Sequence, residues 1–340
     1  TIYMVDMHEP LMFLHNLDTT IKEPFASNPA VLDAVEKNHK KLQIAMTKLY
    51  PGNLVLSLSS GIMYHRLVDR ITALNDVPRE PLVPRRLGKN MCVPFGKILR
   101  GKVVPNTVTK TLHTDKVYEP DLNSFTIEPF PYYSPLKSQI ETIKSFDRPV
   151  ILVDDLVHTA NRLQVLVPQL REDGIPIKKV VVGVLSGYGR DLMQCLKVPV
   201  ESIYSMPNLR QWFVESTLYP FIGGDTVRRE EMKVAGLQPS INMILPYATP
   251  RLSGCSREAL VEFSACCIEN SRDLFQVLEA EYRKMYAKNL TLSRLSEAVI
   301  LPLCPDKGSC MEYDENLAAS VYLENDLETL WRMKEFLIKG

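Results

Sequence analysis

A continuous run of apolar residues that ends abruptly in two acids constrains the fold more than any other feature. Pro149–Val153 forms this run, and Asp154 and Asp155 follow it directly. A second run, Val180–Leu185, is also apolar throughout. Strands of this kind are typical of parallel sheets whose two faces are both covered by helices, and helical segments flank both runs. The sequence therefore predicts an α/β fold built on a parallel sheet.

Caps and chain breaks mark further elements. Asn28 followed by Pro29 predicts a helix that runs towards Tyr50. Pro51-Gly52 then breaks the chain, and Leu54–Leu58 reads as a buried strand that leads into a tight loop at Ser59, Ser60 and Gly61. The same reasoning predicts helices at about 62–74, 134–146, 159–172 and 191–196, and a short strand around residue 203.

Beyond Arg251 the sequence pattern becomes helical. Residues 255–301 contain no Gly and no Pro, and their apolar residues recur at helical spacing. A last helix fits Leu323–Ile338. We therefore expect an α/β domain over residues 1–250, with its core at about 40–225, and a helical extension over 251–340. The extension would pack on the sheet or on a second copy of the chain, as in a homodimer.

Composition narrows the function classes. Of 340 residues, 45% are hydrophobic, and 40 Lys and Arg balance 40 Asp and Glu, which is typical of a globular protein. This balance argues against disorder and against a nucleic-acid-binding surface. No run of about 18 apolar residues predicts a membrane span, and the N-terminal segment lacks the basic start of a signal peptide. Because the first residue is not Met, the chain could belong to a longer, multidomain polypeptide.

Cysteines and histidines do not form a familiar metal motif. The seven cysteines are an odd number in mostly apolar surroundings, which predicts free thiols in a reducing cytoplasm. No Cys-x-x-Cys is present, and all six histidines lie at or before residue 158, whereas most cysteines lie after it. The sequence therefore predicts no zinc site.

The segment from Val150 to Leu163 is the strongest candidate for ligand binding. In a parallel α/β sheet, ligands bind beyond the carboxyl ends of the strands. Two adjacent acids there, Asp154 and Asp155, would be costly to bury unpaired, and sugar hydroxyls or a metal ion would satisfy them. The next loop opens a helix, whose amide groups and positive dipole end favour phosphate. The segment therefore predicts a ribose 5-phosphate site.

This segment resembles the signature of type I phosphoribosyltransferases that binds 5-phosphoribosyl 1-pyrophosphate (PRPP): a hydrophobic strand, two acids, three residues, Thr, a small residue and a loop into a helix. The resemblance implies that Asp154 and Asp155 hold the ribose hydroxyls as the catalytic acids. It also implies that the 5-phosphate is bound by Thr159, Ala160, Asn161 and Arg162. Two positions depart from the family. Ala160 stands for the usual Gly and restricts the backbone, while Arg162 stands for a usual Thr or Ser and would add a phosphate contact or block the loop.

The resemblance extends over roughly residues 40–225. It implies that Ser59, Ser60 and Gly61 form the pyrophosphate loop, and that Trp212 and Phe213 stack on the base. Residues 81–116, with eight Lys and Arg against one acid, stand where the family has a mobile loop. Each feature has an alternative that involves no ligand. The two acids would be a helix cap and a surface acid, and Ser59-Ser60-Gly61 would be an ordinary β–α turn. Trp212 would be a core aromatic residue, and residues 81–116 would be a solvated basic face.

The implied activity is transfer of phosphoribosyl from PRPP, with Mg²⁺, to a nitrogenous base or amine, with release of pyrophosphate. The alternatives are a domain that senses PRPP or a nucleotide without turnover, and a scaffold whose site has degenerated. The partner would be a small phosphorylated molecule, with neither nucleic acid nor membrane involved. Residues 96–102 match the start of a P-loop, but Val103 replaces the Ser or Thr that would reach magnesium, which argues against an ATPase.

Overall fold

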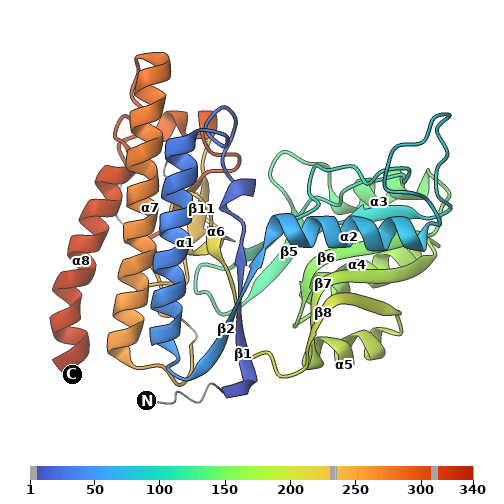
Figure 1. The fold of residues 1–340 in the computed structure, drawn as a ribbon, viewed down its shortest axis with the longest axis horizontal. Helices are drawn as coiled ribbons and strands as arrows, with labels where there is room; N and C mark the ends of the chain where they lie inside the picture. The colour runs from blue at the N-terminus through green and yellow to red at the C-terminus, as the bar shows by residue number, and fades with distance from the viewer. Residues whose placement is uncertain (1–5, 230–233, 235, 251, 308–312, 340) are drawn as a thin grey trace. The chain divides into compact units, whose positions relative to one another are not determined.

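The computed structural model describes residues 6–229, 234, 236–250, 252–307 and 313–339 (Figure 1). The chain forms two compact units. Unit 1 comprises Thr1–Ser57, Val117–Ser124 and Gln211–Gly340, and unit 2 comprises Leu58–Lys116 and Phe125–Arg210. These boundaries differ from a division at residue 250, because both ends of the chain belong to unit 1.

Unit 2 is built on a sheet of four strands in the order β3-β6-β7-β8. Each neighbouring pair is parallel. The strands are β3 (Met91–Pro94), β6 (Val150–Val157), β7 (Ile177–Ser186) and β8 (Val200–Met206). The predicted parallel sheet is confirmed, and β6, which contains the apolar run Val150–Val153, is an interior strand of it.

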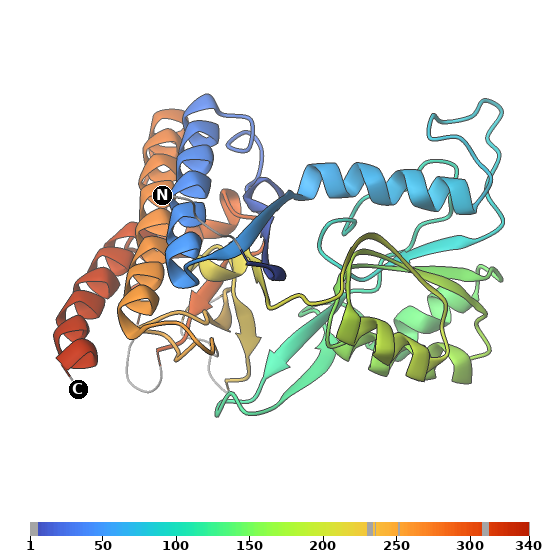
Figure 2. The same ribbon diagram turned by 60° about the horizontal axis from the view of Figure 1, so that its bottom comes forward.

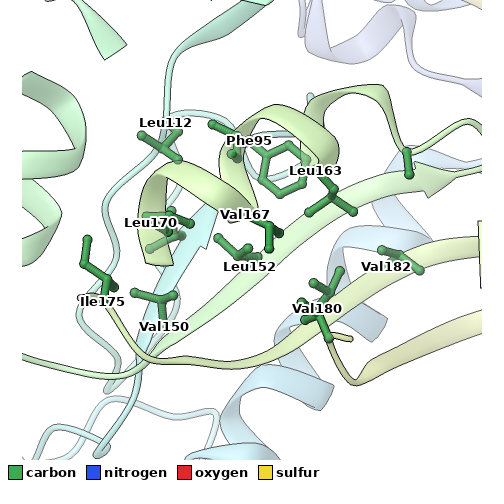
Figure 3. Packing of buried hydrophobic residues seen from close by; sticks show 14 of the residues in the cluster. Phe95, Leu112, Val150, Leu152, Leu163, Val167, Leu170, Ile175, Val180 and Val182 are labelled. Carbon is green, nitrogen blue, oxygen red and sulfur yellow. The ribbon is translucent and has the colours of Figure 1, made fainter. Parts of the chain in front are cut away.

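Helices cover both faces of this sheet. They are α2 (Ser60–Leu74), α3 (Leu136–Lys144), α4 (Asn161–Glu172) and α5 (Gly187–Leu196). On one face, buried residues of β6 and β7 pack against Leu163, Val167 and Leu170 of α4 (Figure 3). On the other face Met63 of α2 approaches Gly183, where a Cβ would lie 2.6 Å from the backbone oxygen of Asp155, so only glycine fits there. The predicted α/β class is confirmed.

The basic stretch 81–116, whose prolines and Gly-Lys turns indicate loops or short strands, contains the short strand β3. All four of its residues are buried, and β3 is an edge strand, where a terminal proline is tolerated.

The buried strand predicted at Leu54–Leu58 exists as β2 (Asn53–Ser59) but is mostly half-buried. The tight loop predicted after it is wrong, since α2 begins at Ser60 with no intervening residue.

Two sheets lie outside the four-stranded one. The first has the order β2-β1-β9, in which β1 (Asp6–His15) pairs in parallel with β9 (Gln211–Val214). The second has the order β12-β11-β10-β4-β5. Its strands are β4 (Thr114–Tyr118), β5 (Phe125–Pro129), β10 (Asp225–Val227), β11 (Gln238–Ile241) and β12 (Leu303–Pro305). The short helices are η1 (Leu17–Thr19), α6 (Glu215–Leu218) and η2 (Leu292–Glu297).

Three long helices of unit 1 lie side by side: α1 (Pro29–Leu49), α7 (Arg257–Tyr286) and α8 (Ala319–Lys339) (Figures 1 and 2). The side chain of Asn28 caps α1 as predicted. Asn38 of α1 and Asn270 of α7 each donate a side-chain hydrogen bond to the other's backbone carbonyl, at 2.7 and 2.9 Å. The predicted helical C-terminal region is therefore confirmed, and it packs on the N-terminal helix α1.

The six described cysteines are all free thiols. Cys92, Cys267 and Cys304 are buried, whereas Cys195 is exposed in spite of its apolar sequence neighbours. Cys310 lies outside the described residues. Among the described helices, none has both the length and the apolar character that crossing a membrane requires.

Candidate functional site

The two acids lie within β6 and do not follow it, which corrects the expectation that the strand ends at Asp154. Asp154 pairs with Val182, and the ladder with β7 continues to Val157. The strand is longer than its apolar run because β7 supplies backbone partners beyond the acids. Both acidic residues are half-buried.

The segment after β3 packs directly on these acids. Asp155 accepts hydrogen bonds from the backbone amides of Lys97, at 2.7 Å, and Ile98, at 3.1 Å. A Cβ at Gly96 would lie 2.5 Å from Asp155 Oδ1 and 2.8 Å from Asp154 Oδ1. Gly96 is therefore required by close approach to the acids, and Asp155 holds the segment in place.

Two arginines near the acids oppose the rise of their pKa values. Arg162 donates to the backbone carbonyl of Phe95 at 3.2 Å, and the Arg100 guanidinium lies 4.3 Å from the centre of the Phe130 ring. Burial raises the pKa of Asp154 to about 7, while the nearby Arg162 opposes this rise. Burial also raises the pKa of Asp155, against the two amide hydrogen bonds that it accepts. Titratable groups perturbed in this way are typical of functional sites.

The pKa of Arg100 responds to the same surroundings. Burial lowers it, and the positive charge of Arg162 lowers it further. Two guanidinium groups and two carboxyl groups thus share a partly desolvated region, so a ligand that carries both hydroxyl and phosphate groups would find partners of each kind there.

The loop after β6 leads into α4 through a left-handed residue. Ala160 has φ 50° and ψ 21°, a conformation that costs an L-residue about 1–2 kcal/mol and glycine almost nothing. The helix begins at Asn161, so Asn161 and Arg162 belong to its first turn and not to the loop. Among the described residues, no side chain caps this end, and Asn161 instead donates to Thr159 Oγ1 at 2.8 Å. The first amides of α4 are therefore suited to an anion.

His158 in this loop has a positioning contact. Its Nδ1 lies 2.7 Å from Ser186 Oγ, and Ser186 Oγ also accepts a hydrogen bond from the amide of Gly189 at 3.0 Å. Burial lowers the pKa of His158, which favours the neutral imidazole. The contact links the loop after β6 to the start of α5, which follows β7.

The remaining predicted site residues lie on other elements. Ser59 is the last residue of β2, and Ser60 and Gly61 begin α2. Trp212 and Phe213 lie in β9 of unit 1, whereas the acids and residues 159–162 lie in unit 2. Phe213 is buried and its ring packs edge-on against that of Phe263, 5.7 Å away, so the structure places it in a core.

Sequence reasoning did not place Gly96, Lys97 and Ile98 against the acids. These residues lie in the basic stretch 81–116, which the resemblance to the family indicated as a mobile loop. Two hollows of unit 2, of about 470 and 520 Å³, lie along β8 and have neither Asp154 nor Asp155 in their linings. The segment from Gly96 to Ile98 packs over the acids instead.

No model of a known protein family matches the chain, and no curated protein sequence matches it. Among solved structures, the chain is similar to a purine phosphoribosyltransferase from Pyrococcus horikoshii Ot3, with 14% sequence identity and a TM-score of 0.28. The match covers 46% of this chain and 86% of the other.

Proposed function

We propose that unit 2 binds the ribose 5-phosphate part of PRPP and transfers phosphoribosyl to a nitrogenous base or amine. The observation that carries the proposal is the short path from the paired acids to the start of α4. Asp154 and Asp155 lie in the last half of β6, and residues 158–160 alone separate that strand from the uncapped helix. Diol acceptors and phosphate donors therefore lie within a few residues of one another at the carboxyl end of one strand, where α/β sheets bind ligands.

The ribose hydroxyls would be held by the acids. An ionised carboxylate has about four acceptor sites, and Asp155 uses two of them for Lys97 and Ile98. Asp154 Oδ1 accepts from the amide of Asp155 at 2.8 Å. Acceptor capacity for sugar hydroxyls thus remains on both side chains.

The 5-phosphate would be held by the first amides of α4 and by Arg162. The guanidinium has five N–H donors, and its bond to Phe95 leaves others for the phosphate. Arg162, which departs from the family pattern, then acts as an additional anion ligand. Ala160 already has the left-handed conformation for which the family's glycine is suited.

The reaction develops positive charge at the anomeric carbon of the ribose while pyrophosphate leaves. Two carboxylates held in place before the reaction would stabilise that charge without reorganisation. Carboxylate oxygens are also suitable Mg²⁺ ligands, and Mg²⁺ bound with PRPP would neutralise the leaving pyrophosphate.

A second candidate, a domain that senses PRPP or a nucleotide without turnover, is favoured by the amides of Lys97 and Ile98 on Asp155. These hydrogen bonds would give Asp155 a structural role that does not require catalysis.

Calorimetric titration of the whole chain with PRPP and Mg²⁺, together with pyrophosphate release measured over a panel of bases and amines, separates the candidates. The transferase predicts saturable binding and release with at least one acceptor. Binding without release supports the sensor. If PRPP does not bind at all, both proposals are wrong and the site is a degenerate scaffold.

The Asp154→Asn variant tests whether the acids form the PRPP site, for the transferase and for the sensor alike. We expect it to lose PRPP affinity while keeping its melting temperature, because the amide keeps the shape of the side chain. The control is Asp191→Asn, which changes an exposed acid of α5 outside the proposed site and should bind as the unmodified chain does.

A further inference from the structure

A cluster of two histidines and a glutamate lies in unit 1, apart from the residues of the proposed ribose site. It consists of His15 at the end of β1, His39 in α1 and Glu215 at the start of α6. One ligand atom from each of the three side chains lies within 4.8 Å of the other two. Among the described residues, this is the group of His, Cys, Asp and Glu side chains whose geometry could hold a metal ion.

The pairing of β1 with β9 brings two of these residues together. The strands are parallel and in register from Leu11 with Gln211 to Leu14 with Val214, so the next residues, His15 and Glu215, emerge side by side. This is the carboxyl end of a parallel pair, where ligand sites form. Directly after it, Asn16 and Ser216 exchange two hydrogen bonds, at 2.9 and 3.0 Å, which hold the two chain segments together.

The third residue comes from the neighbouring helix. The His39 ring lies 3.8 Å from the His15 ring, measured between centroids, and stacks on Phe13 at 5.4 Å. His39 Nε2 lies 3.3 Å from Ser57 Oγ, whereas His39 Nδ1 is buried and has no hydrogen-bond partner among the described residues. A buried imidazole nitrogen without a partner is costly, and metal binding would remove this cost.

Glu215 has the outer partners of a metal-ligating carboxylate. Its side chain is fully buried, and its Oε2 contacts His15 Nδ1. Its Oε1 accepts a hydrogen bond from Tyr219 at 3.0 Å, and the same hydroxyl accepts from Asn270 at 2.9 Å. Hydrogen bonds of this kind orient the residues that bind a metal ion directly, and their loss lowers the affinity for the metal.

The plainer explanation is a buried ion pair between protonated His15 and Glu215. That pair accounts for their contact, but it leaves His39 Nδ1 without a partner. It also places a cationic ring 3.8 Å from a second imidazole. A divalent cation bound by two neutral imidazoles and one carboxylate satisfies all three side chains.

From this geometry we propose that His15, His39 and Glu215 bind a divalent metal ion of the zinc class. Two nitrogen ligands and one oxygen ligand favour Zn²⁺ over Mg²⁺ or Ca²⁺, which prefer oxygen throughout. Three protein ligands leave a fourth position of the tetrahedron for water, the arrangement of open zinc sites. The proposal reverses the expectation, based on local motifs, that the chain has no zinc site.

The test is metal binding by the whole chain after removal of metal with a chelator. Titration with Zn²⁺ should give one site per chain, and Co²⁺ substituted for it should give visible absorption bands of a four-coordinate nitrogen and oxygen site. His39→Gln and Glu215→Gln should each reduce Zn²⁺ affinity by more than ~100-fold, because each removes a ligand. Ser57→Ala should reduce it by about 10–100-fold, because it removes only an outer hydrogen bond.

The matched control is His65→Gln, which removes an exposed histidine of unit 2 and should leave Zn²⁺ affinity unchanged. Circular dichroism checks that each variant is folded. Glu215 is fully buried, whereas His39 is half-buried and Ser57 is exposed. If Glu215→Gln unfolds, the Zn²⁺ affinities of His39→Gln and Ser57→Ala still test the proposal. The proposal is overturned if the unmodified chain binds no Zn²⁺ above the level of a nonspecific surface site, or if His39→Gln binds it as tightly as His65→Gln.

Discussion

Asp154 and Asp155 are neighbours in β6, yet their replacement by Asn should have different effects on stability. Asp155 accepts two backbone amide hydrogen bonds, from Lys97 and Ile98. Asn offers one acceptor oxygen and turns its NH₂ group towards the second amide, so one donor is left facing another donor. The loss of one charge-assisted hydrogen bond predicts a decrease of about 1.5–3 kcal/mol in the free energy of unfolding. In contrast, Asp154 is partly protonated at neutral pH, because burial raises its pKa to about 7.

Thermal unfolding followed by circular dichroism measures the difference. At roughly 2–4 °C per kcal/mol for a unit of about 150 residues, Asp155→Asn should lower the melting temperature by about 3–12 °C. Asp154→Asn should leave the melting temperature unchanged or raise it, since it removes a desolvated charge beside a like charge. Urea unfolding at constant m-value provides an independent measurement of the same free energies.

Equal melting temperatures for the two variants would refute this reasoning, because the Lys97 and Ile98 amides would then contribute nothing measurable. A loss confined to Asp154→Asn would also refute it. It would show that Asp154, and not Asp155, anchors the segment after β3.

Two further predictions follow from the same region. The pKa of Asp154 is raised in the folded protein, so its contribution to stability is fully present below the unfolded-state value of 3.8 and is lost as pH rises through about 7. Urea unfolding across that window should show a decline in the free energy of unfolding, and Asp154→Asn should flatten this decline. An identical pH profile for the variant would contradict the assignment. Gly96→Ala places a Cβ against both carboxylates and should lower the free energy of unfolding by about 1–3 kcal/mol. The control is Gly61→Ala in the first turn of α2, where the new Cβ would meet only Ser59 Oγ, at 3.6 Å, so this variant should be neutral or stabilising. Equal losses of unfolding free energy for the two variants would argue against close approach at Gly96.

Local sequence patterns were enough to predict the elements whose signals lie within a few consecutive residues. The apolar runs of β6 and β7 indicated buried strands, and Asn28 with Pro29 indicated the start of α1. The long stretch without Gly or Pro indicated α7. In each case the main-chain conformation depends on neighbours along the chain, through hydrophobic periodicity and capping, and the sequence displays both.

Tertiary structure alone decided which elements pair and which side chains meet. The strand beside β6 is β3, a run of four residues in a basic stretch, because burial against β6 outweighs its weak local pattern. The amides after β3 then meet Asp155 across nearly 60 residues. His15 and Glu215 meet only because β1 and β9 pair in register 200 positions apart, and packing of α1 adds His39. Such contacts depend on strand register and helix packing between distant segments, and no local motif encodes that register.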